Sequence, residues 1–392
     1  MREVVIVGFA RTPFGAFQGA LASVYAPKLG SIAIKGALQK AKLSPDLVSE
    51  VIMGNVLASG VGQAPARQAA IYAGIPKSVP ALTINKVCGS GMKAIMLGTQ
   101  SILLGDSETA ITGGMENMSQ APYLVQGVRT GFRMGHQSFF DSMILDGLWD
   151  PYNNQHMGNC AELCAREKFF SRKEQDEFAI ESFKRAQQAQ KEGKFKNEIT
   201  AVSIEGKKGD TVLVENDEGP SRVNFDKIST LKPAFDKQGS VTAANSSTIN
   251  DGAAALILMS KERAKALGLE PLARIISYGS FAQAPEWFTT APAGAMKAAM
   301  KKANWKVSEV DLFEVNEAFA VVALAAKKEL EIPHEKYNVW GGAISLGHPI
   351  GASGARIVMT LISALMDKNL KRGVAGICIG GGESTALCVE LL

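Results

Sequence analysis

The sequence predicts an α/β protein in which two similar halves flank an inserted segment of different character. Short apolar runs rich in Val and Ile alternate in both halves with longer helical patterns, such as those over 92–104 and 357–365. This alternation favours βαβ units and mostly parallel sheet. Features of the first part of the chain also recur in the last part at a nearly constant offset. We therefore expect two α/β domains that pack against each other.

Three repeated features indicate a duplication. They are the sequence Val-Ser-Glu-Val at 48–51 and 307–310, a Ser-Gly pair before a helix at 90–91 and 353–354, and a glycine-rich strand end at 112–116 and 379–383. Their common order argues against chance agreement. Between the halves, the segment 119–248 carries polar turns and an amphipathic helical pattern over 172–191. A segment of that length needs structure of its own, so we expect an inserted lid or loop domain.

Composition narrows the class of protein. With 392 residues, 46% of them hydrophobic, the chain can bury a large core. A net charge of +4 is too small to indicate a nucleic-acid partner and suits an anionic small molecule. We expect no secretory signal and no membrane span, because the chain starts in a strand-like run and has no 18 uninterrupted apolar residues. Five cysteines without metal or disulfide spacing predict a reducing compartment, by default the cytoplasm.

Two cysteines stand beside glycine-rich turns. Cys88 opens the sequence Cys-Gly-Ser-Gly at the head of an apolar helix, and Cys378 precedes the glycines at 380–382. A thiol at a helix N-terminus meets the positive end of the macrodipole and unpaired N–H groups, which favour the thiolate. We therefore expect a lowered thiol pKa and a nucleophile at Cys88. A free cysteine is more often a small buried hydrophobe, so the assignment depends on its companion motifs.

Four ordered motifs resemble those of the thiolase family. They are Asn-Lys-Val-Cys-Gly-Ser-Gly at 85–91, Val-Asn-Glu-Ala-Phe at 315–319, the glycine-rich block 341–356 that contains Gly-His-Pro, and Cys-Ile-Gly-Gly-Gly at 378–382. The resemblance covers essentially all of the chain. The segments 152–158 and 241–248 make it closest to the acetyl-CoA acetyltransferase (acetoacetyl-CoA thiolase) branch.

The resemblance implies a five-layered α-β-α-β-α fold. The N-terminal core domain would be 1–118, completed by 249–271, and the C-terminal core domain 272–392. A loop domain, 119–248, would lie over the active site. Family members usually assemble as tetramers of paired dimers, so we expect a homo-oligomer. The duplication and the insert were inferred from the sequence independently and agree with this arrangement.

The resemblance also gives a catalytic role to five residues. Cys88 would take the acetyl group from acetyl-CoA, and His348 would accept the proton of Cys88. Cys378 would remove the α-proton of a second acetyl-CoA, whose enolate attacks acetyl-Cys88 to give acetoacetyl-CoA and CoA. That proton has a pKa of about 20, so the enolate needs strong stabilisation. Asn316, through a held water, and His348 would form one oxyanion site; the N–H groups of Cys88 and Gly380 would form the other.

Substrate contacts follow from the same resemblance. Arg222 and Lys227 occupy the loop-domain stretch that contacts the adenosine part of CoA. Seven residues match family positions around the pantetheine and acyl groups: Leu148, His156, Met157, Ala243, Ser247, Ala318 and Phe319. Phe319 and Met157 are bulky, which predicts a short acyl pocket. Because CoA is substrate and product, we expect no cofactor and no metal.

Several of these residues also have a simpler structural interpretation. Asn316 is a good N-cap for a helix over 317–326, a role compatible with catalysis. Cys160 and Cys164 share a helix face like a metal pair, but core packing is favoured. The glycine runs at 341 and 380 lack the phosphate-binding forms. At the level of the whole chain, a broader-chain 3-ketoacyl-CoA thiolase of fatty-acid degradation and a non-catalytic acyl-CoA-binding protein remain as alternatives.

Two departures from the family pattern flank the catalytic motifs. Trp340 stands where the family commonly has a small polar residue, and Glu383-Ser384 replaces the usual Gln-Gly. Neither changes a catalytic atom, but both are expected to affect packing behind Cys378.

Overall fold

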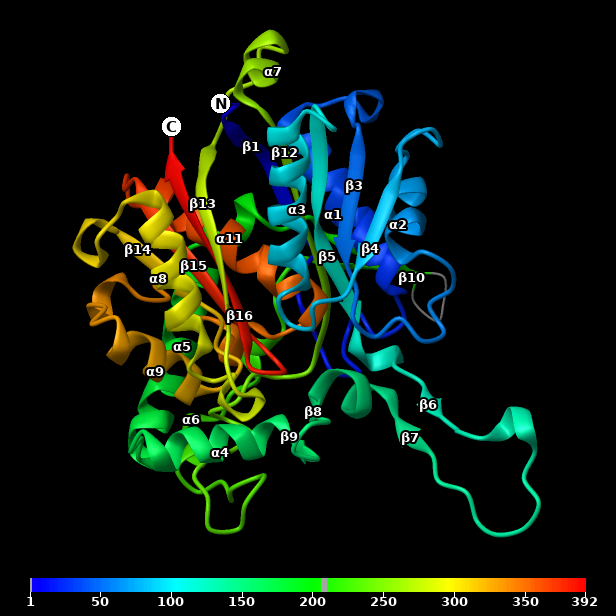
Figure 1. The fold of residues 1–392 in the computed structure, drawn as a ribbon, viewed down its shortest axis with the longest axis vertical. Helices are drawn as coiled ribbons and strands as arrows, with labels where there is room; N and C mark the ends of the chain where they lie inside the picture. The colour runs from blue at the N-terminus through cyan, green and yellow to red at the C-terminus, as the bar shows by residue number, and fades with distance from the viewer. Residues whose placement is uncertain (1, 206–209) are drawn as a thin grey trace.

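The computed structural model describes residues 2–205 and 210–392 (Figure 1). Its N-terminal half contains β1 (Val4–Arg11), β2 (Gly15–Ala16), α1 (Ala26–Ala41), β3 (Glu50–Gly54), α2 (Pro65–Ala73), β4 (Ala81–Ile84), α3 (Ser90–Leu104), β5 (Thr109–Asn117), β12 (Asn250–Ser260) and α7 (Lys261–Ala266). Its C-terminal half contains β13 (Ala273–Ala282), α8 (Ala291–Ala303), β14 (Leu312–Val315), α9 (Ala320–Glu329), α10 (Ala343–Leu346), α11 (Ile350–Asp367), β15 (Arg372–Ile379) and β16 (Glu383–Leu391).

Strand order confirms the duplication. The sheet of the N-terminal half runs β1-β12-β5-β3-β4, and that of the C-terminal half runs β13-β16-β15-β14. In these two orders β1 corresponds to β13, β12 to β16, β5 to β15 and β3 to β14. The strand β4 has no counterpart in the sheet of the C-terminal half. The two sheets meet at β1 and β13, where Val5 pairs with Arg274 and Ile6 with Ala273. This short pairing joins them into one continuous sheet.

The expected mostly parallel sheet is wrong. Among the described residues, parallel ladders between named strands are those of β3 with β4, β3 with β5, and β14 with β15. The strand β12 enters antiparallel between β1 and β5, and β16 enters antiparallel between β13 and β15. The strand β12 follows the inserted segment, and β16 follows β15 after the turn at 380–382. The alternating sequence pattern does not reveal this topology.

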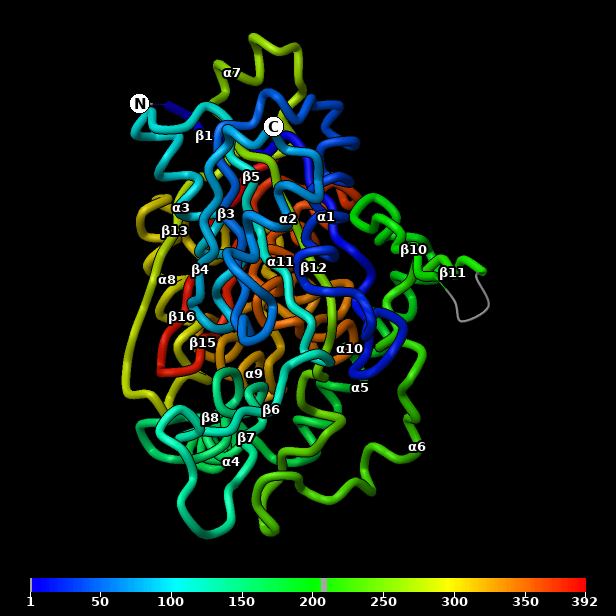
Figure 2. The backbone as a smooth tube through the Cα atoms, turned by 90° about the vertical axis from the view of Figure 1, so that its right-hand side faces the viewer, coloured from blue at the N-terminus to red at the C-terminus, as the bar shows by residue number. Residues whose placement is uncertain are grey.

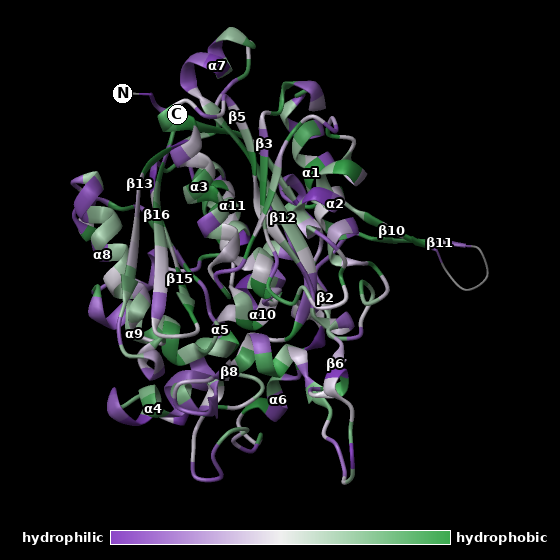
Figure 3. Cartoon of the chain, turned by 45° about the vertical axis from the view of Figure 1, so that its right-hand side comes forward, coloured by the Kyte–Doolittle hydropathy of each residue, from purple (hydrophilic) through white to green (hydrophobic). Residues whose placement is uncertain are grey.

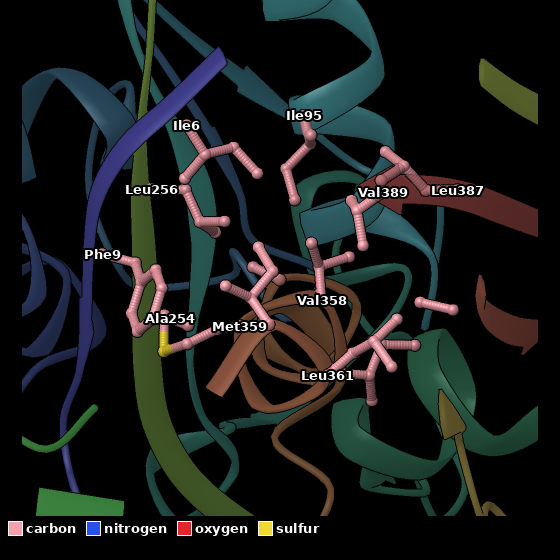
Figure 4. Packing of buried hydrophobic residues seen from close by; sticks show 14 of the residues in the cluster. Ile6, Phe9, Ile95, Ala254, Leu256, Val358, Met359, Leu361, Leu387 and Val389 are labelled. Carbon is pink, nitrogen blue, oxygen red and sulfur yellow. The ribbon is translucent and has the colours of Figure 1, made fainter. Parts of the chain in front are cut away.

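Helices cover and separate the sheets. The helices α1 and α2 lie on the outer face of the N-terminal half, α8 packs on the C-terminal half, and α3 and α11 lie between them (Figure 1). Figure 4 shows Val358, Met359 and Leu361 of α11 among side chains of both halves. This gives the layered arrangement α-β-α-β-α. The apolar patterns at 92–104 and 357–365 fall inside α3 and α11, as predicted.

The central position of α11 explains its composition. Two stretches, Val87–Leu104 and Ile350–Asp367, are long and apolar enough to cross a bilayer by length and composition alone. Of the second, 89% is buried inside the protein, and a helix enclosed on all sides is hydrophobic all round. Figure 3 shows the contrast with α7, which projects from one end of the molecule and is largely hydrophilic.

The inserted segment forms small hairpins and helices. Most of it lies beyond one end of the core strands, whereas the strands at 202–205 and 211–214 project from the side of the molecule (Figure 2). Its elements are β6 (Tyr123–Leu124), β7 (Phe140–Asp141), β8 (Trp149–Asp150), β9 (Gln155–His156), α4 (Met157–Glu167), α5 (Arg172–Lys191), β10 (Val202–Glu205), β11 (Thr211–Val214) and α6 (Phe225–Ile228). The predicted helix over 172–191 is confirmed at both of its ends. Ser171 and Glu174 form a capping box that fixes its start.

Candidate active site

The first turns of α3 and α11 cross in direct contact. A Cβ at Gly91 would lie 2.8 Å from the main-chain N of Ala355, and one at Gly354 would lie 2.5 Å from that of Met92. These are the two Ser-Gly pairs of the duplication, and only glycine permits so close an approach. The crossing brings together the turns that precede the two helices, one carrying Cys88 and the other His348.

The turn that carries Cys88 is strained and held by hydrogen bonds. Val87 has a φ of 44°, a left-handed conformation that a β-branched residue rarely adopts. The Ser90 hydroxyl accepts from the N–H of Lys86 at 2.8 Å and donates to the carbonyl of Val87 at 2.7 Å. The Asn85 side chain accepts from the N–H of Val87 at 2.9 Å. A strained residue next to a candidate nucleophile is typical of a functional turn.

The expected lowering of the Cys88 pKa is wrong for the thiol in this structure. Burial raises the pKa of Cys88 to about 11, although the N–H groups of Gly380 and of Cys88 itself lower it. Desolvation of the thiolate therefore outweighs the helix terminus, and the resting group is a neutral thiol. The side chain is still partly exposed. The same two N–H groups are the pair predicted as an oxyanion site.

The tautomer of His348 is assigned from its hydrogen bonding. The Ser353 hydroxyl lies 2.9 Å from the carbonyl of Pro349 and 2.6 Å from Nδ1 of His348. With its one proton donated to that carbonyl it accepts from Nδ1, so we assign the proton to Nδ1 and leave Nε2 as an acceptor. Nε2 is buried without a partner among the described residues. Burial, together with the charge of Arg356, lowers the pKa of His348 to about 3 and keeps the imidazole neutral.

Asn316 is fully buried, and neither atom of its side-chain amide has a partner among the described residues. Its main-chain N–H donates to the carbonyl of Gly376 at 3.0 Å, which fixes it beside the end of β15. An unpaired buried amide is costly, so it indicates a place for a water or a substrate oxygen. The predicted capping role is wrong: α9 begins at Ala320, its N-cap is Phe319, and that cap makes no side-chain hydrogen bond.

Cys378 differs from Cys88 in its surroundings. It lies near the end of β15 with 0% exposure. Burial, and then the nearby Cys88, raise its pKa well above the ordinary value. The turns of the two cysteines touch, because a Cβ at Gly89 would lie 2.3 Å from Cδ1 of Ile379. A Cβ at Gly380 would meet Met157 Sδ at 3.4 Å, an ordinary contact, so the protein itself leaves room at that glycine.

Four of the predicted substrate-binding residues line one cavity of about 590 Å³: Arg222, Lys227, Ala243 and Ser247. Ala318 adjoins it, because its carbonyl accepts from the N–H of Ser247 at 2.9 Å. Phe235, which lines the cavity, stacks on His156 at 4.8 Å and contacts Phe319 edge-on at 6.1 Å between ring centroids. The structure thus gathers seven of the nine predicted contact residues around one continuous region, with Phe235 as a further member.

The remaining two predicted contacts lie on the cysteine side of this region. Leu148 ends a π-helical turn over Met143–Leu148 and packs on the same apolar cluster as Cys88. Such turns are rare and often occur at functional sites. Met157 contacts the position of Gly380 and packs in one cluster with Cys378 and Phe319.

Two residues of the site were missed by the sequence analysis. Ser353 entered the sequence analysis only as part of the repeat, yet its hydroxyl orients the ring of His348. Its place in the first turn of the helix that follows the histidine could have indicated this role. Glu116 accepts from Asn55, from the N–H groups at 56 and 57, and from the N–H of Gly351 at 2.9 Å. It thereby ties the end of β5 to the start of α11. A lone acidic residue closing an apolar strand was the available signal.

Each residue that departs from the family pattern makes a specific contact in the structure. Trp340 is buried and packs edge-on against Phe195 at 5.8 Å. Glu383 forms an ion pair with Lys86, and the buried Ser384 hydroxyl donates to the carbonyl of Ile377 at 2.7 Å.

The prediction for the two helical cysteines is confirmed, because Cys160 and Cys164 are both buried in an apolar cluster. No group of three or more His, Cys, Asp or Glu side chains suited to a metal ion occurs within residues 2–205 and 210–392.

The duplicated α/β fold brings a cysteine turn, a histidine turn and a second cysteine together, an arrangement suited to cysteine-dependent acyl transfer. The chain belongs to the thiolase family: the models "Thiolase, N-terminal domain" and "Thiolase, C-terminal domain" match residues 4–262 and 269–391. This family assignment confirms the resemblance and the fold class.

Similar proteins match over the full length. A probable acetyl-CoA acetyltransferase of Dictyostelium discoideum is 53% identical, with 100% of this chain and 95% of the relative covered. An acetyl-CoA acetyltransferase of Cupriavidus necator is 52% identical, with 100% of both covered. The crystal structure of the Bacillus anthracis acetyl-CoA acetyltransferase superimposes with a TM-score of 0.97 at 40% identity, covering 100% of this chain and 99% of that one.

Proposed function

We propose that this protein is an acetyl-CoA C-acetyltransferase that joins two molecules of acetyl-CoA into acetoacetyl-CoA and CoA, reversibly and through an acetyl-cysteine at Cys88. The observation that carries the proposal is the meeting of the Cys88 and His348 turns where α3 and α11 cross. Nε2 of His348 and the amide of Asn316 are buried without a partner among the described residues. Buried polar atoms usually have a partner; a bound water can donate to Nε2 and pair with the amide, and a thioester oxygen can accept from the amide N–H. The names of the relatives support the choice of acetyl-CoA.

In the first half-reaction, Nε2 of His348 accepts the thiol proton while Cys88 Sγ attacks the carbonyl carbon of acetyl-CoA. The oxyanion that forms accepts hydrogen bonds from the N–H groups of Cys88 and Gly380. When it collapses, the bond to the CoA sulfur breaks. CoA leaves as the thiol with the proton of Cys378, so His348 remains an imidazolium and Cys378 becomes a thiolate.

In the second half-reaction, the Cys378 thiolate removes an α-proton from a second acetyl-CoA. The imidazolium Nε2–H and Asn316, through a held water, stabilise the enolate oxygen. The enolate carbon attacks acetyl-Cys88, and collapse of the second tetrahedral intermediate releases acetoacetyl-CoA. Cys88 recovers its proton from His348, so all three groups return to their starting states and a ping-pong cycle closes.

The surroundings of the acyl site favour a short chain. Phe319 contacts Phe235 and Phe288 edge-on at 6.1 and 6.3 Å, and Met157 belongs to the same cluster. We propose that these bulky side chains limit the length of the acyl group. Arg222 and Lys227 line the adjoining cavity and supply cations for the phosphates of CoA. In this mechanism CoA is substrate and product, and neither a cofactor nor a metal takes part in a step.

Assembly and location form part of the proposal. The segment β6–β7 extends from the body of the molecule (Figure 1), with Tyr123, Met134 and Phe139 at 66%, 96% and 72% exposure. Exposed apolar side chains of this kind mark contact surfaces, which supports a homotetramer of paired dimers. We place the enzyme in the cytoplasm, in fatty acid metabolism.

The test is mass spectrometry of the intact protein after brief mixing with acetyl-CoA, with acetoacetyl-CoA measured in parallel. We expect one acetyl group, located on Cys88 by peptide mapping, and formation of acetoacetyl-CoA. Cys88→Ser should show neither, whereas Cys388→Ser, a buried cysteine on β16, should show both. A folded protein that gains no acetyl group would contradict the proposal and favour a non-catalytic acyl-CoA-binding protein.

The dependence of kcat/KM on chain length tests the choice of substrate. We expect thiolysis to be fastest with the four-carbon acetoacetyl-CoA and to fall as the 3-ketoacyl chain lengthens. A steady rise toward medium-chain substrates would instead favour a broader 3-ketoacyl-CoA thiolase.

A further inference from the structure

One ion pair joins the turns of the two cysteines. Lys86 lies two residues before Cys88, and Glu383 opens β16 directly after the glycine turn that follows Cys378; Nζ of Lys86 donates to the Glu383 carboxylate. In Figure 1 the β15–β16 turn lies beside the segment that leads from β4 into α3. Among the described residues, no other salt bridge connects these turns. The contact therefore links the N-terminal half to the C-terminal half at the site itself.

Apart from the ion pair, apolar packing and the Gly380 N–H that faces Cys88 connect these turns. Gly89 packs on Ile379, and the position of Gly380 faces Val87, where a Cβ would meet Val87 Cγ1 at 3.7 Å. Neither contact is directional. Val87 is also strained, with a φ of 44°. The hydrogen bonds of Ser90 and Asn85 restrain this turn itself but not its distance from the turn of Cys378. A charge-assisted hydrogen bond has the directionality that the packing lacks.

We propose that the Lys86–Glu383 pair is a positioning clamp that holds the Gly380 N–H at hydrogen-bonding distance from the oxyanion formed at Cys88. Lys86 and Glu383 are positioning residues in this account and take no part in bond making. The inference rests on the proposed function, because it assigns the pair to the acetyl-transfer step. An oxyanion site loses its effect when its donors are displaced by as little as about 1 Å.

The test compares the rate of Cys88 acetylation in a single turnover at saturating acetyl-CoA. We expect Glu383→Ala and Lys86→Ala each to slow acetylation about tenfold with unchanged Kd for acetyl-CoA. The double variant should also lose about tenfold, because both changes remove the same contact. Glu383→Gln should retain most of the wild-type rate, since a side-chain carbonyl still accepts from Lys86.

The matched control is a similar ion pair away from the site. Lys194 and Asp367 are paired at 2.7 Å with side chains 26% and 34% exposed, against 24% and 40% for Lys86 and Glu383. Asp367→Ala should leave acetylation unchanged. Thermal unfolding of all variants should shift little, because pairs this exposed contribute little stability.

Three results would overturn the inference. Both alanine variants could acetylate at the wild-type rate, or the losses of the two single variants could multiply in the double variant. The third is an increase in Kd for acetyl-CoA with an unchanged acetylation rate, which would make Lys86 a CoA contact. A wild-type protein that is never acetylated would overturn the proposed function, and the clamp with it. A wild-type protein that is acetylated normally while its variants do not differ would overturn the clamp only.

Discussion

The two halves of the fold place a serine at the same position of equivalent helices and use it differently. In the N-terminal half, the Ser90 hydroxyl bonds to the main chain of residues 86 and 87 and holds the strained turn before Cys88. In the C-terminal half, Ser353 bonds to Pro349 and to the ring of His348. The duplicated scaffold is the same, and the residues of the preceding turn decide whether the serine restrains a backbone or orients a base.

This contrast extends to the chemistry of the halves. The N-terminal half supplies the partly exposed Cys88, which is reachable by a substrate. The C-terminal half supplies His348, Asn316 and Cys378, with exposures of 5%, 0% and 0%. Burial suits groups that move protons or donate hydrogen bonds, because it shifts their pKa values and excludes water. We infer that the nucleophile belongs to one half and the proton-transfer groups and the enolate-binding groups to the other, whereas the oxyanion site at Cys88 takes one N–H from each half.

The largest effect should come from Cys378→Ser, which separates the two kinds of chemistry. Condensation should fall by about 10³–10⁴, because a serine hydroxyl is a poor substitute for the thiolate base. Acetylation of Cys88 should fall only about tenfold, since it needs Cys378 merely to protonate CoA. Rapid-quench measurement of acetyl-enzyme and of acetoacetyl-CoA distinguishes the steps. Equal losses in both would show that the division between the halves is wrong.

The reaction of Cys88 with iodoacetamide tests the protonation state of the free enzyme. Because burial raises the pKa of this thiol to about 11, it is neutral at pH 7, and its thiolate fraction grows about tenfold per pH unit below the pKa. Alkylation should accelerate by about 10³ between pH 7 and pH 10. Cys88→Ser supplies the background rate. A plateau near pH 8 would instead support the lowered pKa that the helix terminus alone predicts.

The sequence was sufficient for the parts of the fold that depend on local patterns. The duplication, the helix over 172–191 and the four motifs were all readable, because periodicity, capping residues and glycine turns are local signals. The insertion of β12 between β1 and β5, and the short pairing of β1 with β13, depend on long-range contacts that no local signal encodes. The pKa values of Cys88 and His348 were missed for the same reason, since desolvation depends on the whole surrounding protein.

Asn316→Ala should produce the next smaller effect. Loss of one oxyanion-site donor costs about 3–4 kcal/mol, or roughly 10²–10³ in rate, and should appear in the condensation step. The variant should be at least as stable as the wild type, because the amide it removes is buried without a partner. Thermal unfolding and steady-state kinetics check the two statements together. A large loss of stability would assign Asn316 a structural role instead.

The comparison of the two serines gives the smallest and most specific prediction. Ser353→Ala removes the acceptor at Nδ1 of His348, so the neutral ring is free to take the other tautomer with Nε2 protonated, and acetylation should slow about tenfold. Ser90→Ala removes two hydrogen bonds from the strained turn and should lower the free energy of unfolding by about 1–3 kcal/mol. Urea unfolding and single-turnover acetylation of both variants measure the contrast. If the two variants lose stability and rate in the same proportion, the serines do the same work in both halves, and the functional divergence lies only in the residues that precede them.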